Sequence, residues 1–451
     1  MKKRAVKPEA APEPEKPEKP KKGKKRGEDA FALWAAAVEK ADPTHVALAS
    51  SLDQEDVPRI STGNFGLDVA LYGGWPQGRV CIAVGKEKSA KTGSCLNTVV
   101  QWQQNHCASC YRAGTCADGC DYKKSKTKPK AGALWIDVEN RLRRMLPWIK
   151  AHGVDLDRLV IKHPGSGQAV IDFVHNTIRE YGTTVGLIVV DSMANVVSKE
   201  EIDKPTVKGK TAPVNAMLIN KGLRLWTAAA NDLGIREDRL PTVLLINQLR
   251  QTLDQYHPEV QTGGIGLRYA TSVDVRFQSG KYFYVVQDKD GNWVERSKSF
   301  QSGWEPDEDQ SPDFVEINYR VQNSGVCPQG RYGQFRYWLK ALHGRRVGDP
   351  DNPKRVFGYA KKYEMIGRSG RDYKLENCTA PTLDELESNF SADAVSQKIV
   401  WDKLMDLLVY NPPVQPDPVT AQDPDQPVAP SAPSDPSELP SIEAAPMESA
   451  P

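Results

Sequence analysis

One segment of the chain combines residue types that bind phosphate. It reads, in order, Gly85, Lys86, Glu87, Lys88, Ser89, Ala90, Lys91 and Thr92. This order matches the phosphate-loop pattern G-x-x-x-x-G-K-[ST], except that Ala90 stands in place of the second glycine. In that pattern the backbone N–H groups hold phosphate, the lysine adds positive charge and the hydroxyl of Thr92 binds Mg²⁺. We therefore predict a nucleotide site made by these residues and Gly93, with a chance match as the alternative.

Three predicted strands also end in polar side chains that suit phosphate chemistry. One apolar strand ends in Asp191, which can hold Mg²⁺ together with Thr92. Glu139 follows a second strand and can orient or deprotonate a water molecule. Gln248 follows a third and can hydrogen-bond a terminal phosphate. Polar residues commonly end strands, so the simpler reading of each is a strand cap. Their order around one phosphate loop favours a shared site.

The elements that must position these residues follow from hydrophobic patterning. Short apolar runs predict strands at 80–84, 133–137, 159–162, 187–191, 242–247 and 272–277, with further strands at 314–321 and 334–339. Helical spacing is found at 29–40, 168–181 and 216–233, and a last piece at 355–410 reads as helix, short hairpin and helix. Alternating strands and helices predict an α/β fold with a mostly parallel central sheet flanked by helices.

Composition limits the class of protein. The 451 residues carry a net charge of only +2, but the charge is unevenly distributed. Residues 1–27 form a basic Lys/Pro/Glu-rich segment, and residues 411–451 form an acidic, Pro-rich segment. Neither can bury enough apolar surface to fold, so we expect two disordered tails. We find no signal-like apolar region at the start and no apolar run of about 20 residues. We therefore expect a cytoplasmic protein.

Four of the eight cysteines lie close together, at Cys107, Cys110, Cys116 and Cys120. Five lysines follow between 123 and 130. Four thiolates in so short a segment can surround one tetrahedral ion, and in a reducing compartment metal is favoured over disulfide. We favour structural zinc over an iron–sulfur cluster or unliganded thiols, and we treat His106 as a bystander. The expected role is to stabilise the surface insertion at residues 106–130, called the cysteine excursion.

Two long polar segments complete the candidate site. The first, between Asp191 and Arg224, includes Lys208 and Lys210. The second runs from 249 to 267 and contains the Thr-Gly-Gly sequence at 262–264. Long loops in compact domains are usually functional, and basic or glycine-rich loops suit a phosphate backbone. Two solvated loops are the alternative.

Several runs of sequence together resemble the RecA family of recombinases, over about residues 29–410. They are ISTGNFGLD at 60–68, LIVVDS at 187–192, INQLR at 246–250, TGG at 262–264, LRY at 267–269 and YAKKY at 359–363. The resemblance implies ATP and Mg²⁺ bound by Lys91, Thr92 and Asp191, with Glu139 activating water. It implies that Gln248 couples the γ-phosphate to DNA, and that Trp148 stacks on adenine, for which a packing role is the alternative.

The resemblance also implies DNA contacts and a domain plan. The residues implied in DNA binding are Lys208, Lys210, Arg224, Arg250, Thr262, Gly263, Gly264 and Arg268. The implied plan is a helical oligomerisation segment at 28–59, an ATPase core at 60–340 with the cysteine insertion at 106–130, and a small lobe at 350–410. Implied partners are single-stranded DNA, duplex DNA, further copies in a helical filament, and single-stranded-DNA-binding and mediator proteins.

Departures from the family pattern keep other functions open. Besides Ala90 and the insertion, Gln322 and Ser324 stand where the family has paired lysines that reach a neighbouring ATP, although Arg268 retains a cation nearby. The leading prediction is an ATP-dependent recombinase that pairs homologous strands. A ring helicase with the same core, a weakly hydrolysing accessory protein and a nucleotide-regulated scaffold are the alternatives. The divergence suggests a phage- or plasmid-type relative, which would act in its host's cytoplasm.

Overall fold

The computed structural model describes most of the chain between its two ends. The described residues are 30–41, 58–114, 116, 120–125, 129–203, 211–237, 241–251, 259–297 and 304–410. Both tails that we expect to be disordered lie outside these ranges, so that expectation stays a prediction.

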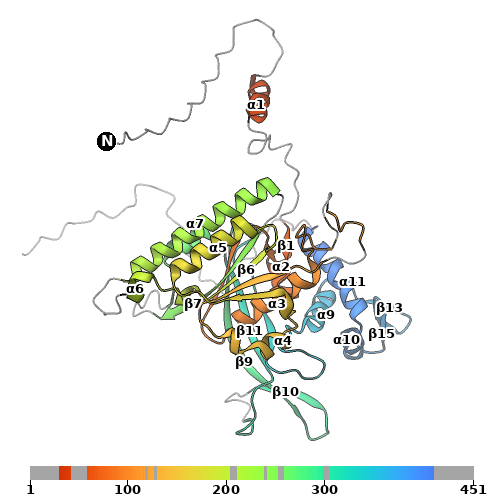
Figure 1. The fold of residues 1–451 in the computed structure, drawn as a ribbon. Helices are drawn as coiled ribbons and strands as arrows, with labels where there is room; N and C mark the ends of the chain where they lie inside the picture. The colour runs from red at the N-terminus through yellow and green to blue at the C-terminus, as the bar shows by residue number, and fades with distance from the viewer. Residues whose placement is uncertain are drawn as a thin grey trace, which may run out of the picture.

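A mixed sheet forms the centre of the molecule (Figure 1). Its main path is, in sheet order, β12 (Tyr332–Trp338), β11 (Phe314–Ser324), β9 (Val273–Gln287), β3 (Val80–Gly85), β7 (Thr242–Gln251), β6 (Leu187–Asp191), β4 (Ala133–Asp137) and β5 (Leu159–Lys162). Neighbouring strands from β9 to β5 are parallel, whereas β12, β11 and β9 pair antiparallel. The prediction of an α/β fold with a mostly parallel sheet is confirmed.

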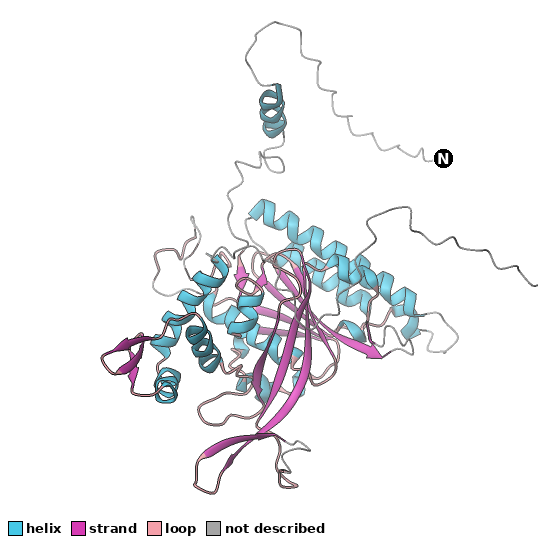
Figure 2. Ribbon diagram, turned by 180° about the vertical axis from the view of Figure 1, so that it is seen from behind, coloured by secondary structure: helices cyan, strands magenta, loops and turns pink. Residues whose placement is uncertain are grey.

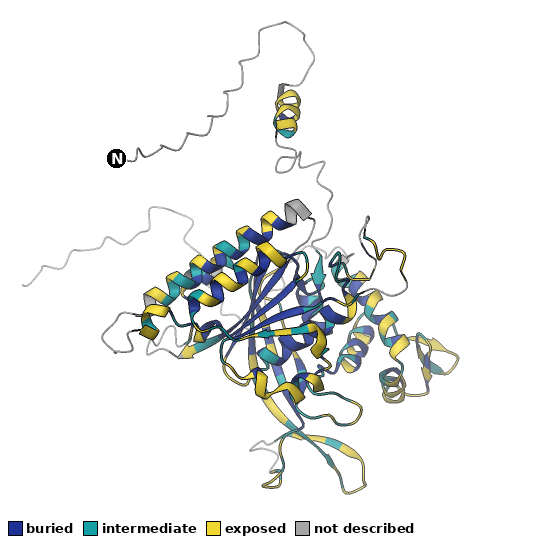
Figure 3. Cartoon of the chain, viewed as in Figure 1, coloured by how far each residue is buried: buried dark blue, intermediate teal, exposed yellow. Residues whose placement is uncertain are grey.

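Helices cover both faces of this sheet. α3 (Lys91–Asn105) packs on one face, and α5 (Gly167–Tyr181) and α7 (Thr211–Glu237) pack on the other. Alternate strand residues therefore serve different layers, so that Cys81 joins the core under α3 and Ile82 joins the core under α5. Strands buried on both faces read as continuous apolar runs, which is why the sequence reveals them. Figure 3 shows these strands as buried ribbons between helices with exposed outer faces.

The small lobe has its own apolar core. It comprises α9 (Asn352–Lys362), β13 (Gly367–Ser369), β14 (Asp372–Leu375), β15 (Cys378–Ala380), α10 (Leu383–Ala392), α11 (Ala394–Met405) and a last turn, η4 (Asp406–Tyr410). The short three-stranded sheet stands apart from the central sheet in Figure 2. The lobe is thus richer than the predicted helix, hairpin and helix. Phe65 enters its core, with its ring 5.2 Å from Tyr359 and 4.9 Å from Trp401.

The remaining elements are short or peripheral. They are α1 (Ala30–Ala41), β1 (Arg59–Ile60), α2 (Phe65–Ala70), β2 (Trp75–Pro76), η1 (Leu142–Arg144), α4 (Leu146–Ala151), η2 (Leu156–Arg158), η3 (Met193–Asn195), α6 (Lys199–Asp203), β8 (Glu259–Gln261), α8 (Ile265–Ala270) and β10 (Trp293–Ser297). None of the described helices combines the length and apolarity that crossing a membrane requires.

Two regions differ from the sequence-based expectation. β9 continues ten residues beyond the predicted end at 277 and pairs with β10, which was not predicted, in a hairpin that projects from the sheet in Figure 1. The predicted loop at 249–267 is partly regular, because β7 reaches residue 251, β8 pairs with it and α8 begins at residue 265. Residues 252–258 lie outside the described ranges.

Candidate nucleotide-binding site

The phosphate loop joins β3 to α3 at the carboxyl edge of the parallel strands. Its turn holds two side-chain-bearing residues at positive φ, Lys88 at 60° and Ala90 at 58°. Ala90 therefore adopts the left-handed conformation that glycine tolerates best, at a cost of about 1 kcal/mol or more. The position of Gly85, in contrast, cannot accept a side chain, since a Cβ there would lie 2.2 Å from the Phe277 carbonyl oxygen. The loop thus accepts alanine by straining it locally.

Lys91 is held over the loop by backbone oxygens. Its Nζ donates to the carbonyl oxygens of Gly85 at 2.9 Å and Lys86 at 2.5 Å, and lies 3.2 Å from the Oγ of Ser89. Burial lowers the pKa of Lys91 to about 8, and the nearby Asp191 carboxylate opposes part of that shift. A charge so poorly solvated would gain from phosphate oxygens, which are stronger partners than carbonyl groups.

Thr92 and Asp191, the predicted Mg²⁺ pair, lie side by side. The Thr92 Oγ1 donates to the Asp191 Oδ2 at 3.1 Å. Asp191 ends β6 and is only 5% exposed, and burial raises its pKa to about 6. A hydroxyl beside a carboxylate offers the oxygen ligands that Mg²⁺ prefers. The residues present therefore fit a magnesium–nucleotide complex.

Glu139 and Gln248 are in direct contact although they follow different strands. The Gln248 Nε2 donates to the Glu139 Oε1 at 3.0 Å, and the Ser192 Oγ donates to the same oxygen at 2.8 Å. Arg141 forms an ion pair with the other carboxylate oxygen of Glu139. The carboxyl ends of β4, β6 and β7 are neighbours in the sheet, so these side chains meet at one edge.

Two residues beside Glu139 were not predicted. Asp137 ends β4, and its carboxylate accepts hydrogen bonds from the backbone N–H groups of Arg141 at 3.2 Å and Leu142 at 2.8 Å. It thereby fixes the turn that carries Glu139. The strand-end signal that identified Asp191 applies equally to Asp137, so this residue could have been found. Nothing in the sequence singles out Arg141.

Trp148 forms one wall of the site together with two residues that were not predicted. Its ring packs edge-on against His152, with ring centroids 4.3 Å apart. The His152 Nδ1 lies 2.9 Å from the Trp148 carbonyl oxygen, so the Tyr337 hydroxyl donates to Nε2 at 2.7 Å. Burial lowers the pKa of His152 to about 4 and keeps its ring neutral. The Tyr337 hydroxyl occupies the space above Gly93, where a Cβ would lie only 1.8 Å from it.

These groups surround one cavity of about 590 Å³, a volume suited to a nucleotide. The predicted residues that line it are Glu87, Lys88, Ser89, Ala90, Lys91, Thr92, Gly93, Trp148, Asp191 and Gln248. Tyr282 of β9 and Leu339 add apolar surface that was not predicted. Glu139 does not itself line the cavity, but it accepts a hydrogen bond from Gln248, which does.

Lys86 of the phosphate loop forms an ion pair with a residue outside the cavity. Its Nζ lies 2.5 Å from the Glu259 Oε1, and Arg276 of β9 forms an ion pair with the other oxygen of the same carboxylate. These two cations hold the pKa of Glu259 below its ordinary value. Glu259 begins β8, so the phosphate loop is tied to the segment that leads to Thr262. This contact was not predicted.

The residues predicted to bind DNA are only partly described. Arg224 is exposed on α7, and Arg250 donates from Nη2 to the Ala194 carbonyl oxygen at 3.0 Å. The Asn247 Nδ2 donates to the Thr262 carbonyl oxygen at 2.7 Å, which ties the Thr-Gly-Gly turn to the strand end beside Gln248. Gly263 and Gly264 have φ of 103° and 75°. Lys208, Lys210 and the side chain of Arg268 lie outside the described residues.

The two positions that depart from the family pattern are placed on β11. The Ser324 Oγ accepts hydrogen bonds from the backbone N–H groups of Val326 at 3.1 Å and Cys327 at 3.0 Å, inside a turn. Gln322 borders a separate hollow beside Arg276 and Arg320. Ser324 therefore stabilises the turn after β11. Gln322 has the basic side chains of Arg276 and Arg320 close to it.

The cysteine cluster lies away from the cavity, beyond the far end of α3. The sulfur atoms of Cys107, Cys110, Cys116 and Cys120 all lie within 4.8 Å of one another. The prediction that these four residues come together is thus consistent with the structure, and the bound species stays a proposal.

Known proteins resemble this chain in sequence. The model of the RecA N-terminal domain matches residues 38–125 and 123–296. The RecA protein of Sulfurimonas denitrificans is 36% identical over 359 residues, which are 78% of this chain and 85% of that protein. Protein RecA of Mycoplasma genitalium is 30% identical over 260 residues, 57% of this chain and 65% of that protein. Protein RecA of Rickettsia prowazekii is 31% identical over 223 residues, 49% of this chain and 55% of that protein. The chain thus spans just under two thirds of the Mycoplasma relative and about half of the Rickettsia relative.

Proposed function

Because the chain belongs to the RecA family, we propose that it is an ATP-dependent recombinase. It would form a filament on single-stranded DNA and promote homologous pairing and strand exchange with duplex DNA. The observation that carries the proposal is the hydrogen bond from Gln248 to Glu139, beside the Thr92–Asp191 pair. This hydrogen bond connects Glu139, a carboxylate suited to hydrolysis, to β7, the strand that leads towards the proposed DNA-binding segment.

Each side chain has a defined task in this proposal. The backbone of the phosphate loop and Lys91 hold the phosphates, and Thr92 and Asp191 hold the metal ion. When bound, Mg²⁺ neutralises charge on the phosphate oxygens. The Glu139 carboxylate orients the attacking water and accepts its proton. Trp148 stacks on the base, with His152 and Tyr337 supporting its position.

The same contact provides a route between nucleotide and DNA. Gln248 is free to exchange its bond to Glu139 for one to a γ-phosphate, which moves the end of β7. The neighbouring Asn247 is bonded to Thr262, so the Thr-Gly-Gly turn follows that movement. Arg224 and Arg250, with the basic residues at 208, 210 and 268, would then contact the DNA phosphates.

The domain plan is part of the proposal. The segment at 28–59, which includes α1, would dock on the next copy in the filament, the core at 60–340 would bind ATP and DNA, and the lobe at 350–410 would contact duplex. The exposed side chains of Lys361 and Arg371 in that lobe support a contact with phosphate.

The decisive experiment measures ATP hydrolysis with and without single-stranded DNA. The wild type should be stimulated by DNA, whereas Glu139→Gln should lose about 10²–10⁴-fold in turnover while still binding ATP. Glu308→Gln, on an exposed segment, is the matched control and should behave as wild type. Turnover that neither DNA nor Glu139→Gln changes would refute the mechanism. Electron microscopy on DNA separates filaments from helicase-type rings.

A second candidate is a weakly hydrolysing accessory protein that modulates another recombinase. The confinement of Ser324 to a turn favours it, because the family has at this position a lysine that reaches a neighbouring ATP. Strand exchange assayed with this protein alone discriminates the two. Joint-molecule formation without a second recombinase supports the first function, and its absence together with stimulation of an added RecA protein supports the second.

A further inference from the structure

We propose that Cys107, Cys110, Cys116 and Cys120 bind one structural zinc ion that staples the surface excursion to the ATPase core. This site is separate from the nucleotide cavity and lies beyond the proposed recombinase function. The four sulfur atoms lie within 4.8 Å of one another, and none of the eight cysteines forms a disulfide bond. Zinc bound to four thiolates at about 2.3 Å requires sulfurs about 3.8 Å apart, so the ligands need only a small contraction.

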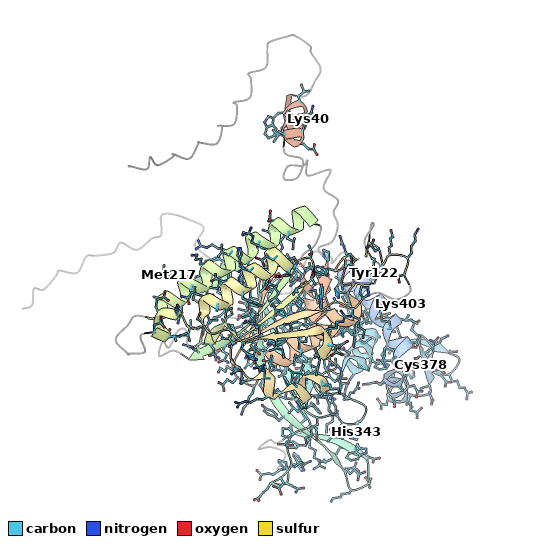
Figure 4. All side chains as sticks on the ribbon, viewed as in Figure 1. Lys40, Tyr122, Met217, His343, Cys378 and Lys403 are labelled. Carbon is cyan, nitrogen blue, oxygen red and sulfur yellow. The ribbon has the colours of Figure 1, made fainter. Side chains whose placement is uncertain are left out.

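The sequence of the excursion offers little besides its cysteines to hold its shape. Between residues 107 and 130 the only large apolar side chains are Tyr111 and Tyr122. Tyr111 is buried in the core below, and Tyr122 is 37% exposed (Figure 4). The excursion instead buries thiols, with Cys107 at 0% and Cys116 at 4% exposed. With so little apolar surface to bury, such a segment gains much of its stability from a cross-link or a bound metal.

Local backbone geometry prepares the first ligand. The backbone N–H of Ser109 donates to the Cys107 sulfur at 3.5 Å, which helps to orient that sulfur. The Tyr111 N–H donates to the Cys107 carbonyl oxygen at 2.9 Å, which turns the chain so that Cys110 faces Cys107. The backbone alone therefore sets the relative position of these two ligands.

The geometry favours a single ion over an iron–sulfur cluster. Both use four cysteine thiolates, but a cluster of several iron and sulfide ions would hold the cysteine sulfurs farther apart than 4.8 Å. Zinc also accepts a closed tetrahedral set of thiolates without an open position, as structural sites do.

The base of the excursion connects the metal to α3. The Tyr111 hydroxyl donates to the Gly182 carbonyl oxygen at 2.8 Å, and its ring lies 5.4 Å from Trp102 near the end of α3. His106 stacks on the same Trp102 with centroids 4.4 Å apart. Zinc would thus fix the carboxyl end of the helix whose first turn carries Lys91 and Thr92. Loss of zinc should therefore lower stability while leaving the phosphate loop intact.

The first test is the metal content of the full chain. We expect one zinc per chain, released by a mercurial thiol reagent and detected with a chromophoric chelator. Apo protein prepared under reducing conditions should bind one equivalent of added Zn²⁺, and Co²⁺ in its place should give the intense visible bands of a tetrahedral thiolate site. Iron with acid-labile sulfide, or failure of the apo protein to bind Zn²⁺, would overturn the proposal.

Variants locate the site. Cys110→Ser and Cys116→Ser should each lose the zinc, whereas Cys378→Ser, at a buried cysteine of the small lobe, should retain it (Figure 4). If a ligand variant fails to fold, metal removal from the wild type supplies the same readout, with a lower melting temperature and ATP affinity changed less than twofold. Zinc retained by both ligand variants would refute the assignment.

Discussion

Adding one methyl group at Gly93 should destabilise the protein, although it should stabilise an ordinary helix. Alanine in place of glycine inside a helix gains about 1 kcal/mol. At Gly93 the new Cβ would lie 1.8 Å from the Oη and 2.4 Å from the Cζ of Tyr337, so the ring must move. Overpacking costs about 1–3 kcal/mol, and separating the hydroxyl from His152 costs about 1–3 kcal/mol more. The net loss of unfolding free energy should be about 1–5 kcal/mol.

Urea denaturation of the wild type, the two single variants at Gly93 and Tyr337, their double variant and one control tests this reasoning. Gly93→Ala should lower the unfolding free energy of the wild type, but in a Tyr337→Leu background the same change should be neutral or stabilising, because the ring is gone. Gly358→Ala is the matched control, since a Cβ added to that helical glycine would meet no neighbouring atom within 4 Å, and it should gain about 1 kcal/mol. Equal destabilisation by Gly93→Ala in both backgrounds would refute the role of Tyr337.

Three further predictions concern the loop and its surroundings. Because burial raises the pKa of Asp191 to about 6, its charge is lost below that pH, and MgATP affinity should fall by up to about tenfold per pH unit in acid, whereas Asp191→Asn should bind weakly without that dependence. Ala90→Gly should raise stability by up to about 1 kcal/mol in urea denaturation and leave turnover unchanged, because Ala90 already holds the conformation of glycine. Glu259→Gln should weaken ATP-dependent binding of single-stranded DNA by about threefold to tenfold in fluorescence anisotropy, since it releases β8 from Lys86 and Arg276.

Each of these predictions has a clear contrary result. MgATP affinity that is constant from pH 7 to pH 5 would mean that Asp191 does not hold the ion. A marked rise in turnover for Ala90→Gly would make the alanine a brake on hydrolysis. For Glu259, Lys86→Met supplies the comparison: DNA binding that is unchanged in both variants would remove this link between the phosphate loop and β8.

The parts of the fold that the sequence reveals are those governed by short-range rules. β3, β4, β6 and the first part of β7 are buried on both faces, so each shows a continuous run of apolar residues. The far half of β9 was missed because its side chains are mostly part-exposed and Gly280 interrupts the pattern. Pairing with β10, not local propensity, makes that segment a strand.

The residues of the candidate site also fall into those that the sequence could predict and those that it could not. Asp191, Glu139 and Gln248 could be predicted because a polar residue at the end of a parallel strand must lie at the carboxyl edge. Tyr337 could not, because its contact with Gly93 joins residues far apart in sequence and depends on how β12 meets α3. The left-handed backbone of Ala90 was also beyond prediction, since it opposes that residue's own preference.

The neck of the cysteine excursion has a consequence for engineering. Cys107 pairs with Lys130 in an antiparallel bridge, and the Ala108 N–H donates to the Pro129 carbonyl oxygen at 2.9 Å. Entry and exit are therefore adjacent, and the two matched family segments meet at residues 123–125, inside the excursion. A fluorophore or peptide tag grafted after Ser125 would leave the register of the sheet untouched. The proposed assembly on DNA could then be followed with a label that does not disturb the core.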